Sequence, residues 1–150
     1  MSFALDIQKF AKKCVTRSDL VVRKVVLDIG RSLVEKTPVG NPDLWQNPDN
    51  KPDGYVGGHA RANWSHSIGA LVNQEFKEID ATGGASINRI ISSVPVKAAG
   101  EVHYIQNSLP YMQALEDGHS KLQAPGPYAI VGRTEIEFQD KVQEALGGIK

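Results

Sequence analysis

Residues 101 to 127 read Glu-Val-His-Tyr-Ile-Gln-Asn-Ser-Leu-Pro-Tyr-Met-Gln-Ala-Leu-Glu-Asp-Gly-His-Ser-Lys-Leu-Gln-Ala-Pro-Gly-Pro. The first six residues are rich in β-formers, and Pro110 ends the strand because proline has no N–H for a ladder. Proline suits the start of a short helix, and Gly118 follows where a left-handed cap is needed. The stretch therefore predicts a strand, one or two helical turns and a polar loop.

The N-terminal part of the chain predicts two helices. Apolar residues recur at helical spacing in the first, at Phe3, Ile7, Phe10, Ala11 and Cys14. Thr16 and Asp19 resemble a capping box, after which a longer helix is expected to run to Thr37, before Pro38. Cys14 lies on the apolar face, so we expect a small buried side chain rather than a reactive thiol.

The remaining patterns predict short strands and two further helices. Residues 63–70 alternate with the period of a half-buried strand, residues 75–79 fit a second short strand, and a third helix ends before Pro95. A last helix can start at Pro127, although residues 128–138 also fit a strand. Together these elements predict one α+β domain over residues 1–150, in which N-terminal helices and a C-terminal helix pack on a small, mostly antiparallel sheet.

Composition narrows the function classes. The chain has 150 residues, 41% of them hydrophobic, which suits a single domain with a real core. No apolar run reaches the roughly 18 residues of a spanning helix, and no signal-peptide pattern opens the chain, so we expect a cytoplasmic protein without membrane contact. The formal net charge is zero, whereas nucleic-acid-binding proteins usually carry a basic excess. The net charge therefore does not indicate nucleic-acid binding by the protein as a whole.

Residues 41–58 form a long loop rich in Pro, Gly, Asn and Asp. The loop carries four apolar side chains, Leu44, Trp45, Tyr55 and Val56. Such anchors dominate the energy of binding interfaces, so we predict that the loop docks onto a neighbouring molecule. The alternative, that it folds back over its own core, stays open at this point.

Three residues on the best-marked apolar faces are expected to be buried and structural, namely Trp64, Tyr111 and Leu115.

The four histidines, His59, His66, His103 and His119, raise the question of catalysis. No His-Glu-x-x-His, Gly-x-Ser-x-Gly or phosphate-loop motif accompanies them. Residues 49–60 superficially resemble a calcium loop, but Lys51 and Ala60 stand where oxygen ligands are required. We therefore predict no enzyme activity, no cofactor and no metal.

A resemblance to a known family is carried by the pattern Val-x-Tyr-Ile-x-Asn-x-Leu-Pro-Tyr-x-x-x-Leu-Glu-x-Gly-His-Ser over residues 102–120, followed by Gln123-Ala124-Pro125. It resembles the C-terminal signature of the tail-completion and neck proteins of long-tailed bacteriophages, the minor tail protein Z-like group. Upstream, residues 35–40 and 58–64 resemble that family's Thr-Pro-Val and Gly-x-x-Arg-x-x-Trp pattern. The family keeps these two pieces closer together, so residues 41–57 look like an insertion.

The resemblance implies a virion structural protein at the head–tail junction. It implies a ring of six subunits, acting in tail completion, as a neck component or as a tail terminator, with the tail tube on one side and head-completion or portal-side proteins on the other. Phage DNA would pass through this ring without sequence-specific binding, and the protein would stay in the host cytoplasm until assembly. The alternative is a small cytoplasmic adaptor that binds one protein partner through the 41–58 loop.

Overall fold

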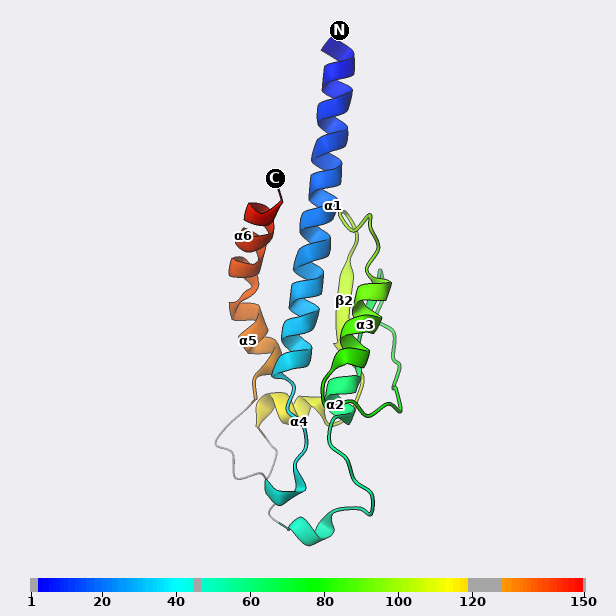
Figure 1. Ribbon diagram of the computed structural model, residues 1–150, viewed down its shortest axis with the longest axis vertical. Helices are drawn as coiled ribbons and strands as arrows, with labels where there is room; N and C mark the ends of the chain where they lie inside the picture. The colour runs from blue at the N-terminus through cyan, green and yellow to red at the C-terminus, as the bar shows by residue number, and fades with distance from the viewer. Residues whose placement is uncertain (1–2, 45–46, 119–127, 150) are drawn as a thin grey trace.

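The computed structural model describes residues 3–44, 47–118 and 128–149 (Figure 1). In chain order the elements are α1 (Phe3–Lys36), the short 3-10 turns η1 (Pro42–Leu44) and η2 (Pro48–Asn50), α2 (His59–Ala62), β1 (Trp64–Ile68), α3 (Gly84–Ser93), β2 (His103–Asn107), α4 (Met112–Asp117), α5 (Ile130–Ile136) and α6 (Phe138–Gly148). The predicted α+β class is confirmed, with helices predominating over a two-stranded antiparallel sheet.

Helix α1 is continuous over 34 residues, about 51 Å, so the prediction of two N-terminal helices is wrong. The hydroxyls of Thr16 and Ser18 donate to the carbonyls of Lys12 and Cys14, four residues earlier. These hydroxyls therefore join the helix instead of capping a new one, and no proline or glycine precedes Gly30 to interrupt it. None of the helices in the described ranges, α1 included, is both long enough and apolar enough to cross a membrane.

The sheet presents two different faces. Trp64 lies opposite Asn107, His66 opposite Ile105, and Ile68 opposite His103. These residues share the inner face, because residues directly opposite each other in a sheet point the same way. Ser65, Ser67, Tyr104 and Gln106 share the outer face.

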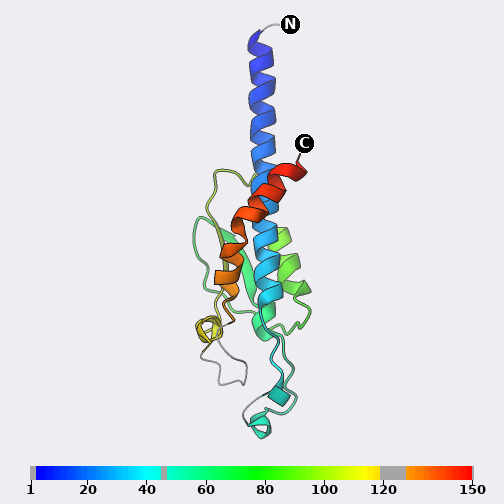
Figure 2. The same cartoon turned by 90° about the vertical axis from the view of Figure 1, so that its left-hand side faces the viewer.

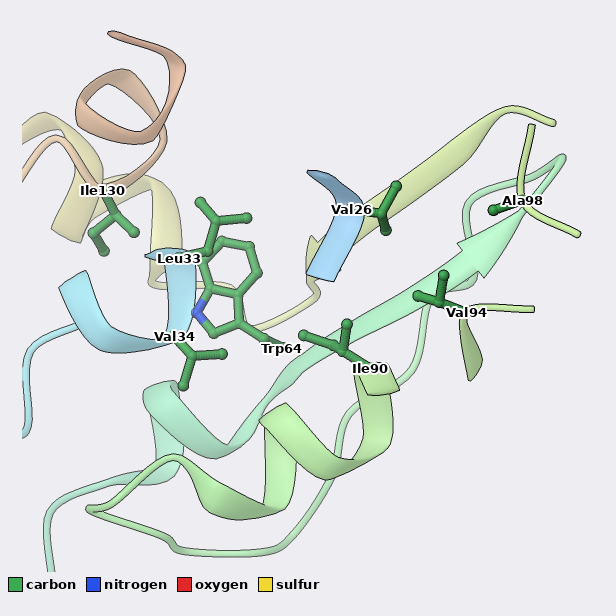
Figure 3. Close-up of a cluster of buried hydrophobic side chains, with 8 residues drawn as sticks. All are labelled: Val26, Leu33, Val34, Trp64, Ile90, Val94, Ala98 and Ile130. Carbon is green, nitrogen blue, oxygen red and sulfur yellow. The ribbon is translucent and has the colours of Figure 1, made fainter. Parts of the chain in front are cut away.

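The core lies between the inner face of the sheet and the helices α1, α3 and α5. Figure 3 shows Trp64 of β1 pointing at Leu33 and Val34 of α1, with Ile90 of α3 beside it. Trp64 is only 4% exposed, as predicted, and Leu115 is half-buried against the same cluster. The C-terminal half of α1 is therefore the central element of the core.

The predicted strand over residues 75–79 is absent. Side chains rather than a backbone ladder hold the chain from residue 72 into this range: the Val72 N–H donates to Gln106 Oε1 (3.2 Å), and the Phe76 N–H donates to Asn63 Oδ1 (2.7 Å). Asn63 Nδ2 donates back to the Phe76 carbonyl (2.9 Å). Because Gln106 lies on the outer face, this segment runs across the sheet instead of extending it.

The last part of the chain is helical, which resolves the two predictions for residues 128–138. Helices α5 and α6 follow each other almost end to end beside α1 (Figures 1 and 2). Polar contacts fix them to α1, since Glu137 Oε2 accepts hydrogen bonds from Ser32 Oγ (2.9 Å) and Lys36 Nζ (2.8 Å). These bonds, together with Lys141, lower the pKa of Glu137 to about 2, with Lys36 the largest cause.

Candidate functional site

A pocket of about 430 Å³ lies where α1 ends, at the opposite end of the molecule from the N-terminus. Its walls come from residues 38–41, residues 58–60 at the start of α2, Tyr111 and Leu115 around α4, and two further tyrosines, Tyr55 and Tyr128. We call it the tyrosine pocket. Leu115, Tyr111 and Tyr55, three residues singled out from the sequence, all line it.

Tyr111 is 42% exposed, so the prediction that it is buried is wrong. Its hydroxyl lies 3.2 Å from His59 Nδ1, at the pocket wall. Partial burial raises the pKa of Tyr111, and the neighbouring Tyr55 and Glu75 raise it further. Tyr111 therefore borders the tyrosine pocket and is not part of the core.

The hydrogen bonds of His59 fix the orientation of its ring. Nε2 lies 2.9 Å from the carbonyl oxygen of Phe76, which can only accept, so Nε2–H donates. In the neutral ring Nδ1 then accepts the Tyr111 hydroxyl proton. The carboxylate of Glu75 lies 3.8 Å from Nε2, beyond a hydrogen bond. His59 thus positions Tyr111.

The ends of the 41–58 loop meet beside the pocket. A Cβ on Gly57 would overlap the carbonyl oxygen of Gly40, and a Cβ on Gly40 would overlap the Tyr55 hydroxyl. Two glycines therefore allow the two stems of the loop to touch. Tyr55 turns back onto the pocket.

The other predicted loop anchors are less informative. Val56 is 60% exposed, and Leu44 ends η1. Trp45 lies outside the described residues, as does His119. Docking of the loop onto a neighbour stays a prediction.

Behind the pocket, a network of hydrogen bonds closes the C-terminal end of α1. Arg61 donates from Nε and Nη2 to the Thr37 carbonyl (2.9 and 2.7 Å) and from Nη1 to Ala81 O (2.8 Å). Trp64 Nε1 donates to Thr37 Oγ1 (2.7 Å), which donates to Leu33 O (2.7 Å). Arg61 and Trp64 of the 58–64 motif thus bind Thr37 of the 35–40 motif. Arg61 binds the Thr37 carbonyl, because the end of a helix leaves carbonyls without partners in the helix.

Asn63 is a buried polar residue that the sequence did not reveal as important. It is fully buried, and its amide bonds the carbonyls of His59 (2.8 Å) and Phe76 (2.9 Å). Asn107 Nδ2 donates to the nearby Ala60 carbonyl (2.8 Å), which joins the end of β2 to α2. No spacing pattern marks an asparagine whose partners are backbone atoms brought close by folding.

The other two described histidines form a pair on the inner face of the sheet. His66 Nε2 and His103 Nδ1 are 2.9 Å apart, with the ring centroids 5.2 Å apart. His103 Nε2–H donates to the Ala98 carbonyl (2.8 Å), and His66 Nδ1 lies 2.9 Å from Ser93 Oγ. Burial, followed by the charge of His103, lowers the pKa of His66. The pair ties the sheet to the segment after α3.

Within the described ranges, no group of three or more His, Cys, Asp or Glu residues is placed to hold a metal ion.

Comparison of the chain with protein-family models, with curated proteins and with solved structures finds no match.

Proposed function

We propose that this chain is a structural protein of a tailed bacteriophage that forms a ring at the head–tail junction. In this role it completes the tail, as a neck, tail-completion or tail-terminator component, and joins it to the DNA-filled head. The ring has six subunits, contacts the tail tube on one side and head-completion or portal-side proteins on the other, and lets DNA pass without reading its sequence.

The observation that supports this proposal is the convergence of the three motif segments. Residues 35–40, 58–64 and 102–118 are far apart in the sequence, and each contributes to the walls of the tyrosine pocket. Arg61 and Trp64 bond Thr37, while Tyr111 contacts His59. A chance likeness between short motifs gives no reason for those motifs to meet in space. The convergence favours one structural unit shared with the neck and tail-completion proteins.

The exposed apolar side chains also support the role of a subunit in an assembly. Large apolar side chains are exposed along the first half of α1 and on α5 and α6. Clustered exposed apolar residues mark interaction surfaces, because an isolated soluble chain gains nothing by leaving them in water. This distribution favours an assembling structural protein over an enzyme with one concave active site.

The test is deletion of the gene from the phage genome, with the intact gene supplied on a plasmid as the control. The expected result is DNA-filled heads and separate tails in electron micrographs, with joined particles restored by the plasmid. Full heads attached to working tails in the deletion strain would contradict the proposal. A stable one-to-one complex of the purified protein with a single non-virion partner would favour the adaptor alternative instead.

The role of the loop is tested separately by deleting residues 43–55. Because Gly40 and Gly57 already touch, the shortened chain can close without moving the stems. If the loop is an interface, the melting temperature stays nearly unchanged and the protein fails to join its ring or the tail. A deleted protein that unfolds would show that the loop covers its own core.

A further inference from the structure

The first half of α1 projects beyond the rest of the molecule. In both views its N-terminal turns stand clear of α6 and of the sheet (Figures 1 and 2). Asp19 Oδ1 accepts the Ala99 N–H (2.9 Å), which ties α1 to the segment between α3 and β2. We call residues 3–20 the arm, a helical rod of about 27 Å.

The arm carries an apolar stripe that nothing in the described chain covers. Ile7 and Val15 are exposed, and Phe10 is 69% exposed. Cys14, predicted to be buried, is exposed on the same stripe. Ile7, Phe10 and Cys14 follow each other at spacings of three and four residues, the arrangement by which a helix inserts anchors into an apolar groove.

An apolar groove of about 340 Å³ lies on the same chain, between β2 and the α5–α6 pair. Ile29 and Leu33 of α1 form its floor, Ile105 one wall, and Val131 and Phe138 the other. Val131 is 52% exposed, and Phe138 is also exposed. A second depression, bounded by Glu116, shares Ile105 and Val131 with the groove and therefore lies next to it.

The arm cannot fill the groove of its own chain. Helix α1 is uninterrupted from Phe3 to Lys36 and supplies the groove floor, so its arm points away from that floor along the helix axis. Filling the groove with an arm requires a second copy.

The charges of the two surfaces are complementary. The arm holds four basic residues, Lys9, Lys12, Lys13 and Arg17, against Asp6 and Asp19, which gives 4 − 2 = +2. Glu135 lines the groove, and Glu116, whose oxygens accept the Val131 and Gly132 N–H groups, lines the depression beside it. Opposite charge at the rim of an interface favours the correct partner and speeds association.

We propose that the arm of one copy lies in the groove of the next copy. This inference rests on the proposed ring and supplies its subunit contact. Because the arm and the groove are different surfaces, the contact is head to tail, and repeating it builds a ring when the rotation closes. Phe10 and its neighbours on the stripe pack against Val131 and Phe138, while the basic side chains lie along the acidic rim.

The experiment compares three full-length variants with the wild type by mass photometry and light scattering. Phe10→Glu disables the arm, Val131→Glu disables the groove, and Leu71→Glu is the matched control at a residue that is 68% exposed on the segment after β1. All three positions are exposed, so circular dichroism should show the wild-type fold. The wild type and Leu71→Glu assemble. Each of the other two stays monomeric, with its association constant lowered about 30-fold or more.

Mixing the two disabled variants identifies the geometry. The Val131→Glu copy keeps a working arm and the Phe10→Glu copy keeps a working groove, so the mixture should give one-to-one dimers and nothing larger. If Val131→Glu alone still assembles, arms pair with each other and the inference is overturned. Assembly of Phe10→Glu would show that another segment, such as an extended strand along β2, fills the groove. A wild type that stays monomeric at its highest soluble concentration also overturns it.

These outcomes are separable from the proposed function. Rings that form equally well from Phe10→Glu and Val131→Glu would remove the arm contact and leave the ring at the head–tail junction standing. A gene deletion that leaves virions intact would remove the virion role and leave the arm contact untouched.

Discussion

Residues 3–20 and residues 22–34 of α1 carry apolar side chains at the same helical spacing, but they meet opposite surroundings. In the second range Val26, Leu33 and Val34 are buried, and Val34 is completely so. In the first range Phe10 and Val15 lie open to solvent. The period of a sequence thus shows which side of a helix is apolar, and the tertiary structure shows whether anything covers it.

The boundary between the two halves has identifiable contacts. Asp19 accepts the Ala99 N–H, and the Arg23 guanidinium donates to the Val94 carbonyl. The segment that joins α3 to β2 therefore reaches α1 at this point, which is also where its buried part begins. On the other side, α6 packs along α1 and ends at Gly148.

The largest expected effect comes from removing the side chain that covers the buried half of α1. Trp64→Ala should lower the free energy of unfolding by about 3–5 kcal/mol, because it leaves a cavity beside Leu33 and Val34 and removes the bond to Thr37. The matched change in the arm, Phe10→Ala, should change the free energy of unfolding of the monomer by no more than about 0.5 kcal/mol, because the ring is 69% exposed in the single chain. Urea unfolding of the purified proteins measures both. Equal losses would mean that the arm is part of the core.

A smaller effect is expected from enlarging a small residue in each half. A Cβ at Gly30 would lie 3.0 Å from Ile90 Cγ2 and 3.1 Å from its Cδ1, so Gly30→Leu must push α3 away. Overpacking of this kind costs about 1–3 kcal/mol. Ala11→Leu, on the exposed arm, should be close to neutral under the same thermal melt. A destabilised Ala11→Leu monomer together with an unaffected Gly30→Leu would reverse the assignment of the two halves.

The smallest expected effect is a dependence of the melting temperature on the protonation of His66. The folded chain holds the pKa of His66 below 6.5, so the unfolded chain binds this proton more readily. The contribution of His66 to stability is therefore complete above pH 6.5 and declines as the pH falls through that value toward the folded pKa. Melting temperatures between pH 8 and pH 5 should fall more steeply for the wild type than for His66→Asn. Parallel curves would show that the histidine pair does not couple to folding.

Much of the fold could be predicted because the preferences of neighbouring residues agreed with the tertiary structure at these positions. The alternation around Trp64 gave β1, Pro110 preceded α4, and Gly118 has the predicted left-handed conformation with φ 79°. The Thr16 capping signal failed because the same hydroxyl could bond a carbonyl within a continuing helix. The prediction of a strand over residues 75–79 failed because the side chains of Gln106 and Asn63, and not a neighbouring strand, accept the backbone N–H groups of this part of the chain.

The candidate site was predicted only in part. Tyr55, Tyr111 and Leu115 were singled out for different reasons, and the fold brings all three into one pocket. The sequence could not show this, because the pocket forms from segments as far apart as Pro38 and Tyr128, 128 − 38 = 90 positions. The roles of His59 and Asn63 depend on carbonyl groups, which every residue carries and which no sequence pattern distinguishes.

The sequence by itself determined where helices and strands form and which of their faces are apolar, because these properties depend on neighbours a few positions away. Only the tertiary structure decided which apolar faces are covered. Burial depends on elements that arrive from distant parts of the chain, so Trp64 is enclosed while Tyr111 borders a pocket. For the same reason Cys14 and Phe10, which continue the stripe of a buried helix face, remain exposed at an end of the molecule that none of the other described elements covers.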